Sequence, residues 1–225
     1  MNYYSDKGEM VTISLDPEKN ANINAQKYYK KYQKAQTAKK LADKQSQESM
    51  QEIDYLESTL QSIESCGELS AANEIRDELI REGYIKKIKT KKTSGKTPES
   101  KPYHFISGDG YDIFVGRNNR QNDLLTMKMA RGDDLWLHTQ SIPGSHVIIK
   151  AIDGKISEEA LHDAAVLAAW FSKGRSSSNV PVDYTLRRNI KKPNGSKPGY
   201  VIFTTHSTIN VTATPARFKQ IQPAT

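Results

Sequence analysis

The stretch that decides the fold is 116–149, GRNNRQNDLLTMKMARGDDLWLHTQSIPGSHVII. It follows a strand-like run at 112–115 and opens with six consecutive Arg, Asn and Gln residues. Polar and apolar residues alternate through 134–138, which predicts a strand, and Pro143-Gly144 predicts a turn into the next one. Hydrogen-bonding side chains are denser here than a hydrophobic core requires. The pattern therefore favours a surface that binds a polyanion.

The flanking sequence extends this pattern into an α+β domain. Asp109-Gly110 lies between two strand-like runs and predicts a hairpin at 103–116. The other expected elements are strands at 135–139, 146–151, 180–186, 199–205 and 208–212, and helices at 123–130, capped by Asn122, and at 157–174. Because strands outnumber helices, we expect a mostly antiparallel sheet backed by helices.

The first part of the chain predicts a long helix followed by a short one. Residues 10–15 alternate like a strand that belongs to an upstream domain. Asp16-Pro17-Glu18 is typical of a helix start, with Asp as the N-cap and Pro at the first helical position. Gly67 is expected to end the long helix, and the shorter helix should end near Gly83.

A heptad pattern runs along the long helix. Its two core positions hold Ala25, Tyr32, Lys39, Ser46, Ile53 and Leu60, and Tyr28, Ala35, Ala42, Ser49, Leu56 and Ile63. These positions are apolar at both ends and weak in the middle, which predicts an antiparallel coiled-coil hairpin. The second arm is too short to cover the first, so the returning chain, a second copy or an absent domain would cover the rest.

The charge and cysteine content narrow the class of partner. The net charge is +7, and residues 98–225 hold 16 Lys and Arg against 11 Asp and Glu. Such an excess favours phosphate-rich partners, although a basic protein without one is the alternative. Cys66 is the only cysteine, which excludes an intrachain disulfide and fits the reducing cytoplasm. No signal peptide or membrane span is apparent, and a cell-surface location stays open.

Four motifs carry a resemblance to a known family. They are Gly116-Arg-Asn-Asn119, Gln121-Asn-Asp123, Asp134-Leu-Trp-Leu-His138 and Pro143-Gly-Ser-His146. In this order they resemble the signature of the NFACT-R domain, which closes the RqcH/NEMF proteins of ribosome-associated quality control, also described as fibronectin-binding protein A-like. The resemblance covers 103–214, and the preceding helices resemble the family's coiled-coil middle domain. Because the family's large N-terminal domain is absent, we expect the C-terminal part of a longer protein.

Five segments are expected. They are a remnant of an upstream domain at 1–16, a coiled-coil helical hairpin at 17–85, a Lys-rich linker at 86–101, an NFACT-R-like RNA-binding domain at 102–215 and a tail at 216–225. The linker has six lysines within 86–96, which is typical of a solvated flexible strap.

The resemblance implies a non-catalytic fragment without a metal or cofactor. It would bind RNA of the large ribosomal subunit and tRNA, and support C-terminal alanine tailing of stalled nascent chains. Two other classes stay open: a fibronectin-binding, adhesin-like module, and a metal-dependent nuclease or hydrolase that uses Asp134, His138 and His146. Self-association through the coiled coil also stays open.

The side chains expected to contact RNA offer forked guanidinium groups, ammonium groups, amides, imidazoles and an indole. They are Arg117, Asn118, Asn119, Arg120, Gln121, Lys128, Arg131, Trp136, His138, Ser145, His146, Arg175, Arg187, Arg188, Lys191, Lys192 and Lys197. Arg117 and Asn119 are expected to project into solvent from a strand end. Trp136 is either a core residue or a platform on which a base stacks. The basic hairpin around 189–198 is either a solvated tip or an RNA-backbone contact.

Overall fold

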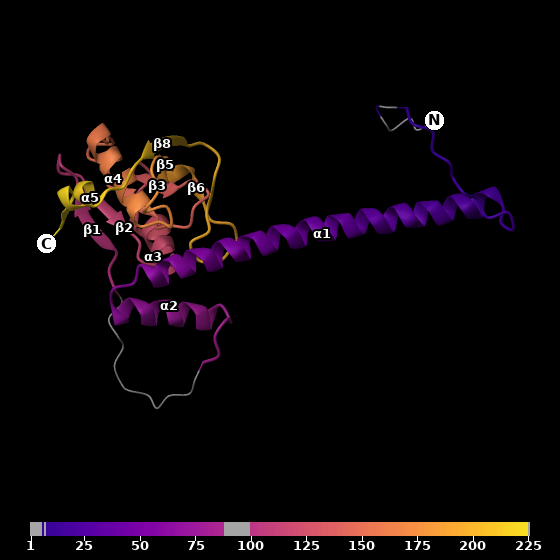
Figure 1. Cartoon of the computed structure of the whole chain (residues 1–225), viewed down its shortest axis with the longest axis horizontal. Coiled ribbons are helices and arrows are strands. Elements are labelled where there is room, and N and C mark those ends of the chain that lie inside the picture. Colours follow the sequence, from indigo (N-terminus) through magenta and orange to yellow (C-terminus); the bar gives the residue numbers. More distant parts are fainter. Residues whose placement is uncertain (1–5, 7, 88–99, 225) are drawn as a thin grey trace. The chain divides into compact units, whose positions relative to one another are not determined.

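The structure, a computed structural model, describes residues 6, 8–87 and 100–224 (Figure 1). Most of the expected Lys-rich linker, 88–99, lies outside the described residues. The contacts divide the chain into two units, 1–50 and 51–225. Within the described part of the chain, no helix is long and apolar enough to cross a membrane.

The first helix, α1 (Ala21–Glu64), begins four residues later than the sequence predicts. Asn20, and not Asp16, is its N-cap, because the Asn20 side chain accepts a hydrogen bond of 2.9 Å from the backbone N–H of Ile23. The Asp16 carboxylate instead accepts from the backbone N–H of Glu18 at 3.2 Å, within the turn that precedes the helix. The strand expected at 10–15 is wrong: these residues are irregular, and no described strand pairs with them.

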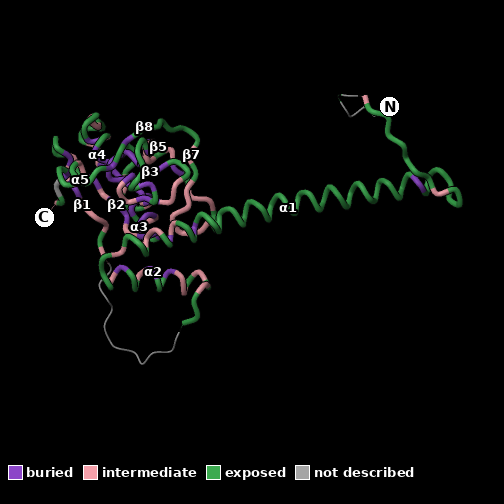
Figure 2. Tube along the Cα trace, viewed as in Figure 1, coloured by how far each residue is buried: buried purple, intermediate pink, exposed green. Residues whose placement is uncertain are grey.

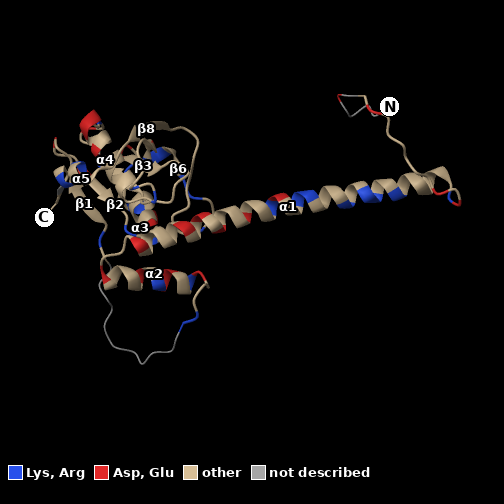
Figure 3. Ribbon diagram, in the orientation of Figure 1, with Lys and Arg blue, Asp and Glu red and all other residues tan. Residues whose placement is uncertain are grey.

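The part of α1 in the first unit is exposed on all sides except at Asn24 (Figure 2). Its charges are segregated along the helix: 21–44 hold seven lysines and one aspartate, whereas 45–64 hold five acids and no Lys or Arg (Figure 3). Residues 21–44 of α1 therefore present a basic surface that is exposed to solvent around the helix, except at Asn24.

In the second unit, the end of α1 and α2 (Leu69–Arg81) form the predicted hairpin. The heptad does not hold it together, because Ile53, Leu56, Leu60 and Ile63 are 40–54% exposed. The buried contact comes from Tyr55, which is outside both heptad positions. Its hydroxyl donates to Glu78 at 2.9 Å and its ring stacks on Tyr84 with the centroids 5.7 Å apart. The buried hairpin contact is thus centred on Tyr55 and not on the expected heptad seam.

The C-terminal part of the second unit is built on a mostly buried antiparallel sheet. Among the described residues its order is β8-β5-β3-β4-β2-β1-β9. The strands are β1 (Tyr103–Ile106), β2 (Asp112–Val115), β3 (Leu135–Thr139), β4 (Val147–Ile149), β5 (Val180–Leu186), β8 (Ser207–Val211) and β9 (Gln222–Pro223). The predictions for β3 and β5 are confirmed to the residue. The expected strand at 199–205 is shorter: β7 (Ile202–Phe203) pairs only with β6 (Ile190–Lys191), in a separate ribbon.

One face of the sheet is covered by α4 (Glu158–Trp170), which starts where predicted but ends earlier than the expected 174; the Ser157 side chain caps it by accepting from the backbone N–H of Ala160 at 3.0 Å. The α4 alanines that face the sheet are fully buried, and such small side chains let the helix pack closely on the strands. The segment after Thr214, expected as a tail, belongs to the domain. It forms α5 (Pro215–Gln220), whose Phe218 packs on the core, and β9, which pairs with β1.

The opposite face carries a second, smaller core. It is covered by α3 (Asn119–Leu124), a π-helical turn at Leu125–Met129, a 3-10 turn at Arg187–Asn189 and the β6–β7 ribbon. Trp136 and Ile148 are the strand residues at its centre, 1% and 0% exposed. Trp136 is therefore a core residue, and the alternative of an exposed stacking platform is wrong.

Candidate nucleic-acid interface

The polar stretch at 117–122 is the first turn of a helix. Asn118, and not Asn122, is the cap: its side chain accepts from the backbone N–H of Gln121 at 2.8 Å, so α3 begins four residues before the expected start. Asn122 instead accepts from the backbone N–H of His146 at 3.1 Å, which ties the helix to the start of β4. The amides thus have local structural roles.

These amides also face the helical hairpin. Asn119 is 2% exposed; its side-chain oxygen accepts from the Ser58 hydroxyl at 2.7 Å, and its nitrogen donates to the Thr59 hydroxyl at 3.0 Å. Asn118 donates to Glu74 at 3.0 Å, and Gln121 donates to the same carboxylate at 3.3 Å. The expectation that this stretch projects into solvent is wrong, because α1 and α2 bury it and supply the partners that buried amides require.

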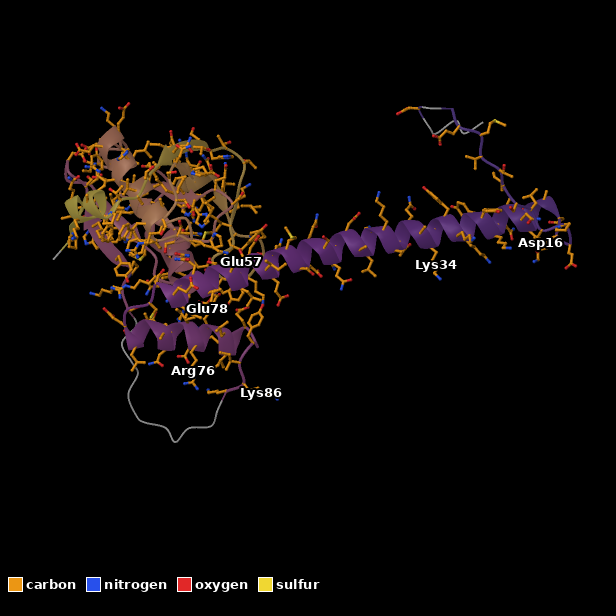
Figure 4. The ribbon with its side chains drawn as sticks, viewed as in Figure 1. Asp16, Lys34, Glu57, Arg76, Glu78 and Lys86 are labelled. Atoms are coloured by element: carbon orange, nitrogen blue, oxygen red, sulfur yellow. The ribbon has the colours of Figure 1, made fainter. Side chains whose placement is uncertain are left out.

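Glu78 is the buried charge in this contact. It is 4% exposed, lies on α2 (Figure 4), and accepts from the Tyr55 hydroxyl at 2.9 Å and from the backbone N–H of Arg120 at 3.2 Å. Burial raises the pKa of the Glu78 carboxyl, and the hydrogen bonds oppose that rise only in part. The contact between the hairpin and the sheet domain is therefore polar, and the carboxylates of Glu74 and Glu78 accept most of its hydrogen bonds.

Removing the Asn119 side chain should destabilise the second unit. Asn119→Ala leaves the Ser58 hydroxyl without its acceptor and removes the donor to the Thr59 hydroxyl, which still donates to Tyr55 O; the loss should cost about 1–3 kcal/mol. Chemical denaturation followed by circular dichroism measures this loss in the free energy of unfolding. The control is Asn194→Ala, at an exposed position, which should change stability by less than about 0.5 kcal/mol. Equal stability of the two variants would contradict the structural role of Asn119.

Arg117 is also held within the second unit. Its guanidinium lies 4.0 Å from the Tyr103 ring centroid and donates to Glu68 at 3.3 Å, and its side chain is 19% exposed. Arg120 keeps an exposed side chain, although its backbone is bonded to Glu78. The backbone N–H of Ser145 donates to Phe171 O at 3.1 Å. Of these three, Arg120 has the most accessible side chain.

The two histidines lie together on the second core, but Asp134 lies apart from them. The His138 and His146 ring centroids are 5.6 Å apart, and His146 Nδ1 is 2.8 Å from the Thr126 hydroxyl. The Asp134 carboxylate pairs with Lys150 and accepts a hydrogen bond from the backbone N–H of Ala151. Asp134 thus lies at the opposite end of β3 from His138. No group of three or more His, Cys, Asp and Glu suited to a metal ion occurs in the described residues. The metal-dependent alternative therefore has no ligand set there.

Burial lowers the pKa of His138 and lowers that of His146 well below its ordinary 6.5. Both imidazoles are therefore neutral at pH 7 in the folded chain. Because the unfolded chain binds these protons first, stability should fall as the pH drops below about 6.5. Denaturation curves between pH 7 and pH 5 measure this slope, which should be smaller in His138→Gln/His146→Gln. The control is His162→Gln, at an exposed position. An equal slope in the wild type, the double variant and the control would contradict the burial of neutral imidazoles at His138 and His146.

The basic hairpin uses much of its charge internally. Arg187 Nε donates to Thr126 O. Lys192 Nζ lies 2.7 Å from an Asp123 carboxylate oxygen, and Lys197 Nζ lies 3.1 Å from Glu82. Their ion pairs and carbonyl contacts make these three residues less available to RNA than unpaired cations, and their role as RNA-backbone contacts stays a prediction. The sequence reasoning missed these acid partners because Asp123 and Glu82 are distant along the chain.

Four other cations, called the basic patch below, are exposed on the segments that cover the second core. They are Lys128, Arg131, Arg188 and Lys191. The backbone N–H of Arg188 donates to Gly132 O at 3.2 Å, which sets the two loops side by side over the second core. None of the four side chains has an ion-pair partner among the described residues, and Asp133 is the exposed acid of the same loop. Unpaired exposed cations are suited to phosphate contacts.

The fold and this surface match a class of nucleic-acid-binding domain. A family model described as NFACT protein RNA binding domain matches 101–205, and one described as NFACT N-terminal and middle domains matches 1–98. The chain belongs to the NFACT family.

Similar proteins agree with this assignment. The chain is 40% identical over 213 residues to "Rqc2 homolog RqcH" of Bacillus subtilis, and 41% identical over 223 residues to the protein of that name in Streptococcus suis. These alignments cover 94% and 98% of this chain but only 37% and 39% of the relatives. A solved structure, the C-terminal of the fibronectin/fibrinogen-binding protein from Streptococcus suis, has a TM-score of 0.80 at 40% identity. That alignment covers 92% of this chain and 81% of the solved one.

Proposed function

We propose that the chain is the non-catalytic, RNA-binding part of a ribosome-associated quality control factor in the cytoplasm. It binds RNA of the large ribosomal subunit and tRNA, and it supports the C-terminal alanine tailing of stalled nascent chains. The observation that carries the proposal is the exposed, unpaired basic patch on a domain that matches an RNA-binding family model over 101–205. The names of the RqcH relatives support the ribosomal setting.

Cross-linking to large ribosomal subunits tests the proposal, with mapping of both the protein and the RNA side. Adducts on the protein should concentrate at Lys128, Arg131, Arg188 and Lys191, and those on the RNA should fall at a few discrete positions. The same number of exposed cations elsewhere, at Lys39, Lys101, Lys155 and Lys219, provides the comparison. Adducts distributed evenly over both groups would count against a dedicated RNA surface.

A second candidate comes from the similar solved structure, which is part of a fibronectin/fibrinogen-binding protein. In that case the chain is an adhesin-like module, located at the cell surface, and it should bind immobilised fibronectin saturably. Competition decides between the two candidates. RNA that displaces fibronectin from the wild-type chain would show a shared basic surface, whereas no saturable fibronectin binding removes the second candidate.

Self-association through α1 is part of the same proposal. The exposed side chains Tyr28, Tyr32, Ile53, Leu56 and Leu60 all occupy heptad positions. Analytical ultracentrifugation should show a concentration-dependent dimer that Leu56→Ser/Leu60→Ser weakens. If the chain stays monomeric over the whole concentration range, self-association through α1 is excluded, and the exposed heptad side chains would have to contact a different protein or RNA.

A further inference from the structure

A groove of about 370 Å³ lies at the end of α4, and nothing in the proposed function uses it. One wall is the loop that follows α4, with Arg175 and the three serines 176–178; the other is the segment 212–215 after β8. Trp170, the last residue of α4, lines it as well. The groove is therefore an open one, flanked by two loops that the sheet and the helix bring together.

An aromatic stack positions the only cation of this groove. The Arg175 guanidinium lies 3.6 Å from the Trp170 ring centroid, and Trp170 in turn stacks on Phe218 with the centroids 4.3 Å apart and the planes 8° apart. Stacking leaves the in-plane N–H groups of a guanidinium free to donate. Arg175 thus presents a fork of donors whose direction is set before any ligand arrives.

The backbone of the serine loop is ordered by its own hydrogen bonds. The N–H of Arg175 donates to Ser172 O at 3.2 Å, and the N–H of Ser177 donates to Gly174 O at 2.9 Å. Across the groove, the N–H of Asn179 donates to the Thr212 hydroxyl at 3.0 Å. The hydroxyls of serines 176–178 are exposed and have no partner among the described residues. Three donors therefore stand beside the Arg175 fork.

The charges around the groove favour an anion. Its lining contains no Asp or Glu, and Arg175 has no ion-pair partner within the described part of the chain. Asp163, a buried acid of α4, already pairs with Arg217 at 2.6 Å. Lys173 does not line the groove and pairs with Glu57 at 3.9 Å. A ligand with several acceptor oxygens would meet Arg175 and the serine hydroxyls without repulsion.

We propose that this groove binds one phosphate of an RNA strand together with its ribose. Arg175 donates two parallel hydrogen bonds to the phosphate oxygens, a geometry that guanidinium groups share with phosphates. The serine hydroxyls bond the remaining oxygens and the ribose hydroxyls, which distinguish RNA from DNA. The site lies on the α4 side of the sheet, whereas the basic patch lies over the second core. The inference rests on the proposed function for RNA as the source of the phosphate.

The first test uses ribose 5-phosphate, which contains the recognised groups and no base. Because Trp170 lines the groove and Trp136 is buried, tryptophan fluorescence should change saturably on titration. Arg175→Ala should abolish the change. Arg175→Lys, which keeps the charge but not the fork or the stack, should weaken binding about tenfold. A basic-patch variant with alanine at all four positions should bind ribose 5-phosphate as tightly as the wild type. No saturable change in the wild type would overturn the site.

The second test separates this site from the proposed function. A short single-stranded RNA should bind Arg175→Ala about tenfold more weakly than it binds Lys219→Ala, which removes an exposed cation nearby. If Arg175→Ala binds RNA normally while the basic-patch variant does not, the proposed function stands and the groove is not an RNA site. If ribose 5-phosphate binds but RNA does not, RNA is the wrong source. The last outcome is that a polyglutamate peptide binds the wild type as tightly as RNA does, with Arg175→Ala abolishing that binding. This result would identify the groove as a site for carboxylates and overturn the proposal.

Discussion

Replacing Lys128, Arg131, Arg188 and Lys191 together with alanine should flatten the salt dependence of RNA binding. Each cation that neutralises a phosphate of a single strand adds about 0.7 to the slope of log affinity against log salt, so four contacts add about 3. Between 50 and 200 mM salt the wild type should therefore lose about 50-fold more affinity than the variant. At low salt the wild type should bind much more tightly.

The quadruple variant should fold normally, because all four side chains are exposed. Its control replaces Lys39, Lys101, Lys155 and Lys219, which removes the same charge from other exposed positions. Filter binding at several salt concentrations measures both slopes, and circular dichroism checks the fold. If both variants show the same reduced slope, general charge accounts for binding and the basic patch has no special role.

Trp136→Ala should have the largest effect on stability. The indole is 1% exposed and lies 5.1 Å from the Phe203 ring and 5.2 Å from the His146 ring, centroid to centroid. Removing it empties the centre of the second core and should lower the free energy of unfolding by about 3–5 kcal/mol. The exposed Tyr29→Ala, also an aromatic truncation, should cost less than about 0.5 kcal/mol.

The same variant decides how Trp136 relates to RNA. If it holds only the core, RNA binding of Trp136→Ala should follow the folded fraction, and Trp136→Phe should restore most of the binding. If affinity falls while the unfolding curve is unchanged, Trp136 contacts RNA directly and the core assignment is overturned. Denaturation and binding therefore have to be measured on the same samples.

Local patterns in the sequence predicted much of the sheet domain. The strands at 135–139 and 180–186 and the helix start at Ser157 are confirmed, because period-2 alternation and helix start signals depend on neighbours within a few residues. The family resemblance rested on spaced short motifs and is also confirmed. The sequence could not predict that the heptad residues of α1 are exposed. A heptad pattern predicts an apolar stripe on the helix but does not say which segment packs against it.

What the sequence alone determined about this chain is its α+β class, the position of several sheet strands and its basic character, all of which follow from local composition and periodicity. Only the tertiary structure decided which polar residues remain accessible. Asn118, Asn119 and Gln121 face α1 and α2, and Lys192 and Lys197 meet Asp123 and Glu82. Burial and pairing depend on segments that are distant in sequence. The same amide or ammonium group can therefore serve as a ligand contact or as an internal bond, and only its partners in the fold distinguish the two.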